Sequence, residues 1–139
     1  PYTTLFRSLW PAAGAAPRSV NDGSLVLRLR YGRVGLLLAG DLEATGEQAL
    51  VTSGQALASN LLKVPHQGSR TSCSELLLDA VRPTHAVISV GPNSYGHPAP
   101  ETVARLRARG IDLHRTDLGG MVTYATDGAR LRQSAYGRR

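Results

Sequence analysis

The pattern of apolar and polar positions predicts two neighbouring strands near the start of the chain. Residues 24–31 (SLVLRLRY) place a leucine at every second position with Val26, Arg28 and Arg30 between them, which is the period of a strand with one wet face. Residues 34–39 (VGLLLA) form a continuous apolar run, typical of a strand covered on both faces. The intervening Gly32-Arg33 step predicts a hairpin in which the second strand is the more central.

Helical and strand patterns then alternate along the rest of the chain. Thr45 and Gln48 lie at capping-box spacing in a predicted helix over 42–51, and Thr71 or Ser72 is the expected cap of a second helix. The further elements predicted are strands over 60–64, 85–90, 112–115 and 121–125, helices over 73–81 and 101–109, and a last hairpin turn near 127–128. This order, with short connections, predicts a layered α/β domain.

The two ends of the chain differ from this pattern. Residues 1–8 (PYTTLFRS) have no periodicity and join abruptly to a different composition, so we interpret them as a non-native leader outside the fold. Residues 133–139 form a polar, basic tail that is expected to fray. The domain itself is therefore assigned to residues 9–132.

Composition narrows the class of protein. A chain of 139 residues with 42% hydrophobic and 19% charged residues is typical of one globular domain, and excludes disordered, collagen-like and repeat proteins. The longest apolar run, 34–39, is far shorter than the about 20 residues that a membrane-spanning helix needs, so no span is expected in this chain. The lone Cys73 excludes an internal disulfide.

Charge suggests a partner class. Sixteen basic residues against ten acidic ones give a net charge of +6, and fifteen of the sixteen are arginine. Arginine makes planar, bidentate contacts with phosphate, so a polyanionic partner is one interpretation; a solubilising surface is the other.

Three polar side chains follow apolar strands or lie in the loop after one. They are Asp41, His66 and His97, and strand ends in layered α/β folds meet at a common crevice. Carboxylate oxygen and imidazole nitrogen are also ligands of divalent metals. The alternatives left open are a helix N-cap for Asp41, a donor to backbone for His66 and a turn residue for His97. For His85 and His114, structural roles are favoured.

Five motifs in order carry a family resemblance. They are NDGSLVLRLRYG, LLLAGD, LLKVPHQGSRTS, SYGHP and RTDLGG. Together they resemble the C-terminal half of the metallo-β-lactamase-like domain of the DNA internalisation-related competence protein family ComEC, over roughly residues 9–127.

The resemblance implies a fold and a site. The fold would be a partial αββα sandwich, with a mixed sheet flanked by helices. Asp41 would be the bridging or second-site metal carboxylate and His66 a late metal-binding imidazole, in a site that holds two Zn²⁺ ions in the complete domain. Ser69 and His97 would lie nearby, facing the substrate, as the candidate catalytic residues.

Two departures from the family pattern limit this prediction. The family's H-H-G-S is replaced by His66-Gln67-Gly68-Ser69, and an amide is not a comparable metal ligand or proton carrier. The early H-x-H-x-D-H motif is absent from this chain. The chain is therefore expected to hold at most half a site, to be inactive alone, and to need the missing N-terminal half of the domain as a partner.

The function implied for the parent protein is metal-assisted hydrolysis of DNA phosphodiesters during natural transformation, with single-stranded DNA as the partner. The resemblance implies a soluble domain of a bacterial inner-membrane protein, on the extracytoplasmic face. One alternative is a non-catalytic nucleic-acid-binding or scaffold domain of a competence protein. Another is a related hydrolase that acts on a small ester or lactam.

Overall fold

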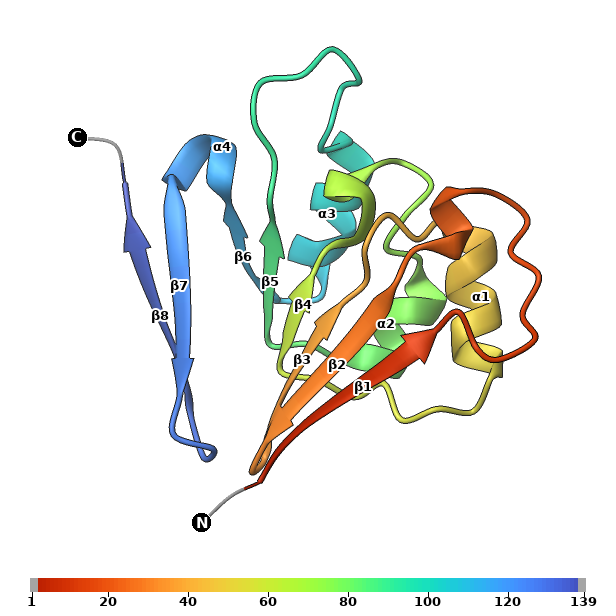
Figure 1. The fold of residues 1–139 in the computed structure, drawn as a ribbon. Helices are drawn as coiled ribbons and strands as arrows, with labels where there is room; N and C mark the ends of the chain where they lie inside the picture. The colour runs from red at the N-terminus through yellow and green to blue at the C-terminus, as the bar shows by residue number, and fades with distance from the viewer. Residues whose placement is uncertain (1–2, 138–139) are drawn as a thin grey trace.

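The main sheet has six strands in chain order. The computed structural model describes residues 3–137, and Figure 1 shows the strands side by side as β1 (Thr4–Trp10), β2 (Val26–Tyr31), β3 (Val34–Leu38), β4 (Leu61–Lys63), β5 (His85–Ile88) and β6 (Asp112–Arg115). The first three strands are antiparallel, and β3 to β6 are parallel. The predicted 24–31 and 34–39 hairpin is confirmed, with β3 in the interior of the sheet.

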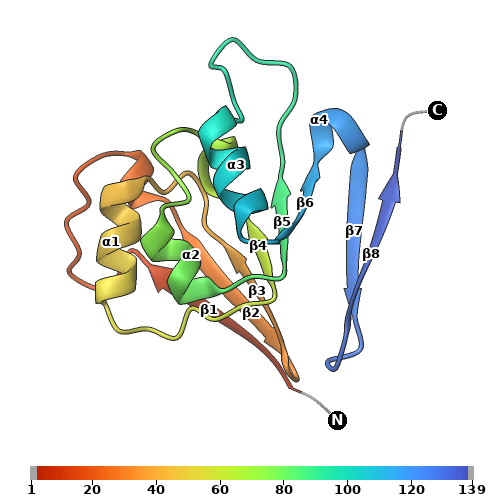
Figure 2. The same cartoon turned by 180° about the vertical axis from the view of Figure 1, so that it is seen from behind.

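Three helices cover one face of this sheet. They are α1 (Ala44–Thr52), α2 (Glu75–Val81) and α3 (Pro100–Ala108), and all three lie in front of the strands when the molecule is seen from behind (Figure 2). The core lies between these layers and includes the fully buried Leu37, Leu62 and Leu77. The α/β class, with a mixed sheet flanked by helices, is thus confirmed.

A separate hairpin packs beside the sheet. It follows the short α4 (Thr116–Gly119) and pairs β7 (Met121–Thr126) with β8 (Leu131–Tyr136). The ring of Tyr124 lies 6.1 Å from that of His85, and the Arg33 N–H donates to Gly128 O at 2.7 Å. A Cβ at Gly32, where φ is +58°, would lie 2.4 Å from Gly128 O, so this contact requires glycine.

The face of the sheet opposite the helices is apolar and incompletely covered. Strand pairing places Leu27, Leu29, Leu36 and Leu38 on this face, and all four are half-buried. Phe6, opposite Leu29, is 68% exposed. The two faces therefore differ, since the helix-facing leucines are fully buried.

The N-terminal residues need a correction. The sequence pattern predicts that residues 1–8 lie outside the fold, but Thr4–Trp10 is β1 and pairs with β2. Trp10 is buried, and its indole N–H donates to Asp22 O. The reason is that the strand is stabilised by pairing with residues far along the chain, which local periodicity does not show. A non-native origin stays a prediction, and residues 1–2 lie outside the described residues.

The C-terminal tail and two helix starts also differ from the prediction. Residues 133–136 belong to β8, because their backbone pairs with β7; residues 138–139 lie outside the described part of the chain. Ser74, rather than Thr71 or Ser72, caps α2 by accepting the Leu77 N–H. α1 has Glu43 at its N-cap, and Thr45 lies inside the helix.

Candidate functional site

The chain segments after β3 and β4 meet at one edge of the sheet. Asp41 follows β3, His66 follows β4, and the His66 N–H donates to Gly40 O at 3.0 Å. Because the two strands are adjacent and parallel, their carboxyl ends carry both residues to the same edge. Asp41 is exposed and its own N–H donates to Ser24 Oγ at 3.1 Å. The N-cap alternative for Asp41 is wrong, because Glu43 has that position.

His66 has an unusual backbone and an unsatisfied ring nitrogen. Its φ is +47° and that of Gln67 is +51°, a left-handed conformation that costs free energy in residues other than glycine and is concentrated at functional sites. Its buried Nδ1 has no hydrogen-bond partner among residues 3–137, although it lies 3.3 Å from Glu43 Oε1. No hydrogen bond from the His66 ring to the backbone is found among these residues, so the structural alternative of a donor to backbone is not observed.

Glu43 is a residue of the site that the motifs did not single out. Its Oε1 also accepts a hydrogen bond from Thr71 Oγ1 at 3.1 Å, so this carboxylate connects the segment after β3 with the segment after β4. The available signal was its position, two residues after Asp41 and just before the predicted helix.

His97 reaches the same edge from the long loop after β5. Its ring centroid lies 5.3 Å from that of His66, at an interplanar angle of 61°. Asn93 supports this loop, since its Oδ1 accepts the His97 N–H at 3.0 Å and its Nδ2 donates to His97 O at 2.8 Å. The exposed Tyr95 stacks on His97 at 6.0 Å. The turn therefore presents two rings beside His66.

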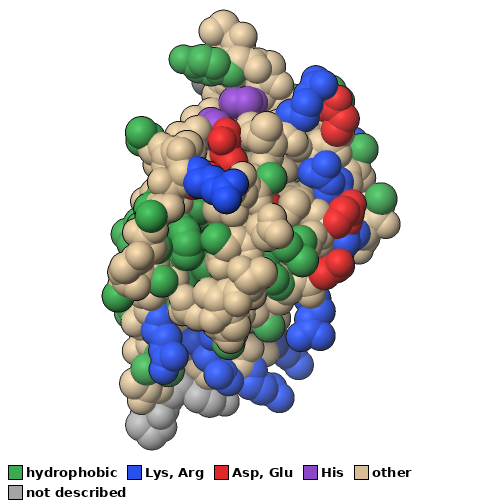
Figure 3. Space-filling view, turned by 90° about the vertical axis from the view of Figure 1, so that its right-hand side faces the viewer, with side chains coloured by type: hydrophobic (Ala, Val, Ile, Leu, Met, Phe, Trp, Pro, Cys, Tyr) green, Lys and Arg blue, Asp and Glu red, His purple; other side chains and the backbone are tan. Residues whose placement is uncertain are grey.

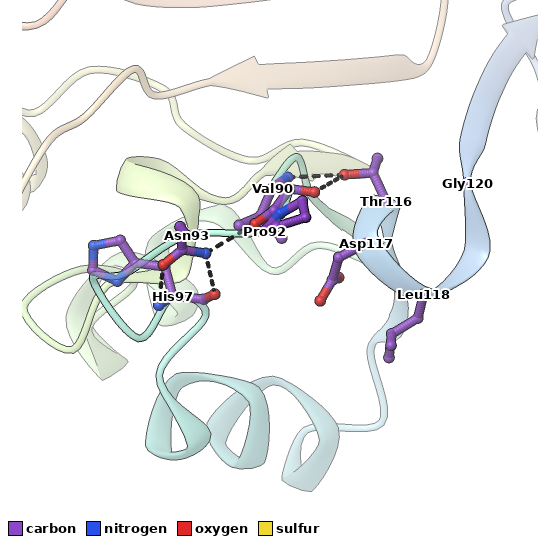
Figure 4. A pocket seen from close by; sticks show the side chains of 9 residues that line it. Val90, Pro92, Asn93, His97, Thr116, Asp117, Leu118 and Gly120 are labelled. Atoms are coloured by element: carbon purple, nitrogen blue, oxygen red, sulfur yellow. Dashed lines mark hydrogen bonds between the residues drawn. The ribbon is translucent and has the colours of Figure 1, made fainter.

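A cavity of about 440 Å³ lies between this loop and α4 (Figure 4). His97 and Asn93 line one side, and Thr116 and Asp117 line the other. Hydrogen bonds from the Arg115 guanidinium hold the pKa of the Asp117 carboxyl below its usual range. The cavity thus has the loop of His97 on one side and, on the other, a carboxylate that is paired with Arg115.

Ser69 lies in the interior of this edge. It is buried, its Oγ shares a hydrogen bond of 3.1 Å with Thr71 Oγ1, and its carbonyl accepts from Thr102 Oγ1 at 2.8 Å. The neighbouring Gly68 O accepts the Ala99 N–H at 2.8 Å. These hydrogen bonds connect the segment of His66 to α3 and to the loop of His97. A role for Ser69 in contacting substrate stays a prediction.

The other two histidines have structural partners. His85 Nδ1 shares a hydrogen bond of 3.0 Å with Thr84 Oγ1, and its ring packs against Tyr124. His114 is buried, and its Nε2 lies 3.0 Å from Gly120 O. The structural interpretation of both residues is confirmed.

A complete zinc centre does not fit the described residues. No three side chains of the types His, Cys, Asp and Glu within residues 3–137 lie close enough together to hold a metal ion. Catalytic zinc sites have three protein ligands and an open position. Asp41 and His66, whose Nδ1 has Glu43 Oε1 at 3.3 Å, are therefore at most part of a ligand set. Within the same residues, no helix is long and apolar enough to cross a membrane.

The chain is similar to proteins of bacterial competence. Competence protein ComA of Neisseria gonorrhoeae is 45% identical over 106 residues, covering 75% of this chain and 15% of that protein. ComE operon protein 3 of Bacillus subtilis (strain 168) is 37% identical over 109 residues, or 78% of this chain and 14% of the relative. Recombination protein 2 of Haemophilus influenzae is 37% identical over 107 residues, which cover 76% of this chain and 13% of that protein. The resemblance to ComEC-related proteins is confirmed.

These relatives are much longer proteins. The chain spans only 13 to 15% of the three lengths, so the similarity concerns one segment of each. A family model described as the metallo-beta-lactamase superfamily matches residues 15–91, which include β2 to β5, Asp41 and His66. With this match over more than half of the chain and the sheet and helices described above, the chain belongs to the metallo-β-lactamase superfamily.

Proposed function

We propose that this chain supplies part of the active site of a competence protein that hydrolyses phosphodiester bonds of single-stranded DNA during natural transformation. The observation that carries the proposal is the meeting of three segments at one sheet edge: His66 N–H bonds Gly40 O beside Asp41, and His97 lies 5.3 Å from His66. Membership of the metallo-β-lactamase superfamily supports a hydrolase, and the similarity to Competence protein ComA supports a role in competence.

Asp41 and His66 are the proposed metal ligands contributed by this chain. Two ligands cannot close a zinc site, so we propose that the remaining ones come from outside the residues described. In the complete domain we propose two Zn²⁺ ions. The half-buried leucines opposite the helices support this arrangement, because they offer an apolar face on which a missing N-terminal half of the sandwich would pack.

His97 and Tyr95 are the proposed substrate contacts. The Tyr95 side chain is 81% exposed and stacked on His97, a geometry that gives a nucleobase a flat surface close to His66. His97 would contact the phosphate, with Ser69 close by.

We also propose that the parent protein lies at the inner membrane, with this domain on the extracytoplasmic face.

A chimaera tests the proposal in a complete domain. The matching segment of the Neisseria gonorrhoeae relative is replaced by this chain, and cleavage of labelled single-stranded DNA by the purified protein is measured together with transformation of the host. Asp41→Asn and His66→Gln should each lower cleavage by at least about 100-fold, since losing a metal ligand costs more than losing its supporting contacts. Asp79→Asn, an exposed carboxylate on α2, is the matched control.

A non-catalytic nucleic-acid-binding domain is the second candidate. It is favoured by the lack of a three-residue ligand group among the described residues and by Gln67 at the position of the family's second histidine. In that case the chimaera carrying Asp41→Ala would bind DNA and support transformation as well as the unsubstituted chimaera does. Cleavage of a chromogenic β-lactam but not of DNA would instead favour a small-molecule hydrolase.

A further inference from the structure

A cleft with four arginines lies at the opposite edge of the sheet from His66. It has a volume of about 340 Å³, and its lining includes Arg28, Arg30, Arg33, Arg82, Ser59 and Asn60. These residues come from β2, from the β2–β3 turn, from the segment before β4 and from the end of α2. No acidic side chain of the described residues lines the cleft.

The four guanidinium groups have no carboxylate partner among residues 3–137. The ion pairs of arginine found there belong to Arg70, Arg105, Arg109 and Arg115. In the cleft, Arg28 donates to Ala58 O at 2.7 Å and Arg30 to Gly32 O at 3.0 Å, both uncharged acceptors. The positive charge of the cleft is therefore not neutralised by the described residues.

Further positive charge surrounds Arg28. The register of β1 and β2 places Arg7 opposite Arg28, on the same face as Arg30. Burial, followed by the nearby charges of Arg30 and Arg7, lowers the pKa of the Arg28 guanidinium. Figure 3 shows basic side chains gathered at the lower end of the molecule, where the β2–β3 turn lies in Figure 1, with the acidic side chains higher up. Like charges repel, so this arrangement favours binding of an anion.

Side chains alternate between the two faces of the sheet along β2, and this explains why its arginines line an open cleft. The positions of β2 that face the helices are Val26, Arg28 and Arg30. Val26 is fully buried in the core, whereas Arg28 is half-buried and Arg30 exposed. Burial on this face of β2 thus decreases after Val26, and arginines occupy the positions at which a longer core would have apolar residues.

We propose that this arginine cleft binds the phosphate groups of single-stranded nucleic acid. Each guanidinium can make bidentate bonds to a phosphate, and several cations in a row match a chain of phosphates. Asn60 Oδ1 accepts the Gly35 N–H at 2.9 Å, which leaves the Asn60 amide nitrogen as an additional donor. A concave cleft of arginines fits a single strand better than the flat surface of a lipid bilayer. The ligand class rests on the proposed function, but binding at this cleft requires neither metal nor hydrolysis, so the two proposals can fail separately.

Fluorescence anisotropy of this chain with a labelled oligodeoxythymidylate of about 15 nucleotides tests the proposal, with EDTA present to exclude metal effects. The variant Arg30→Gln/Arg33→Gln removes two cations of the cleft. The matched control, Arg18→Gln/Arg107→Gln, removes two exposed arginines that lie outside it. Circular dichroism of both variants checks that the fold is retained.

The cleft variant should bind about tenfold more weakly, and the slope of log Kd against log salt concentration should fall by about 1.4, or 0.7 for each lost phosphate contact. The control variant should keep both values near those of the unsubstituted chain. Equal effects of the two variants would overturn the proposal, because they would indicate diffuse charge. So would a cleft variant that retains oligonucleotide binding but loses binding to phosphatidylglycerol vesicles, which would indicate a membrane contact.

Discussion

The imidazole rings of His66 and His97 lie edge to face, with their centroids 5.3 Å apart, although they come from two different loops. The contact depends on hydrogen bonds that join these loops, including that from the Ala99 N–H to Gly68 O. Two imidazoles and the Glu43 carboxylate are thereby brought to the edge where Asp41 also lies. The chain therefore holds a polar cluster in place, although no three of its His, Asp and Glu side chains within the described residues lie close enough together to hold a metal ion.

We expect the isolated chain to bind Zn²⁺ weakly. Two candidate ligands fall short of the three that a zinc site needs, so isothermal titration should give a dissociation constant weaker than about 1 μM. His66→Gln should abolish the residual heat, while His85→Gln should leave it unchanged, because His85 has structural partners elsewhere. Submicromolar binding by the unsubstituted chain would show that it closes the site alone.

Tyr95→Ala should weaken binding of single-stranded DNA by about tenfold or more, since stacking of one base on an aromatic ring contributes about 1–3 kcal/mol. Tyr95 is exposed and packs on His97, so its removal should not unfold the domain. Tyr95→Phe keeps the ring and should bind like the unsubstituted chain. Anisotropy measurements in which both variants lose affinity equally would point to the hydroxyl instead of stacking.

Glu47 is a buried carboxylate that stabilises the start of α2. It accepts the N–H groups of Cys73 and Ser74, so Glu47→Ala leaves two backbone donors without partners in the interior. We expect a loss of about 3 kcal/mol in the free energy of unfolding. Glu101→Ala, at an exposed ion pair with Arg70, should cost less than about 0.5 kcal/mol. Urea denaturation measures both values.

The same carboxyl gives stability a characteristic pH dependence. Burial raises the pKa of Glu47 above its ordinary value of 4.5, although hydrogen bonds from Ser74 and Cys73 oppose the shift. The Glu47 carboxyl therefore binds its proton more tightly in the folded state than in the unfolded state. The stabilisation that comes from this tighter proton binding is complete below the pKa of the unfolded state and is lost as pH rises through the pKa of the folded state. The stability of the unsubstituted chain relative to Glu47→Gln should therefore fall with rising pH. A difference that rises with pH would contradict this assignment.

Deleting residues 1–8 should destabilise the domain. The deletion removes most of β1 and leaves β2 as the sheet edge, with loss of several backbone hydrogen bonds. We expect the free energy of unfolding to fall by about 2–4 kcal/mol, whereas Val20→Ala, at a fully solvated position, should change it by less than about 0.5 kcal/mol. If the midpoint of the unfolding transition is unchanged after the deletion, residues 1–8 do not stabilise the fold and the prediction is wrong.

Much of the fold could be predicted because its signals are local. The alternation in 24–31, the apolar run in 34–39 and the interleaved helices all correspond to observed elements. β1 and the end of β8 could not be predicted in this way, since their stability comes from pairing with other strands. The cap of α2 at Ser74 was missed because Thr71 and Ser72 have the same local chemistry and only tertiary contacts distinguish them.

The candidate site was predictable in part for the same reason. Positions after strands identified Asp41, His66 and His97, and the structure brings their segments to one edge. Glu43 was missed because a glutamate near a helix start usually has a capping or solvent-exposed role. That Ser69 is buried follows from hydrogen bonds to Thr71 and Thr102, which no motif encodes.

The parallel strands of the sheet have a consequence for the size of any ligand. Gly35 lines the arginine cleft and Asp41 lies beside His66, so the two regions stand at opposite ends of β3. About six residues of extended chain separate them, or roughly 20 Å. An oligonucleotide too short to bridge that gap can occupy one end only. Substitutions in the arginine cleft and substitutions near His66 should both lower the affinity only for oligonucleotides long enough to reach both regions. The shortest such oligonucleotide would therefore measure the distance between the two ends of β3.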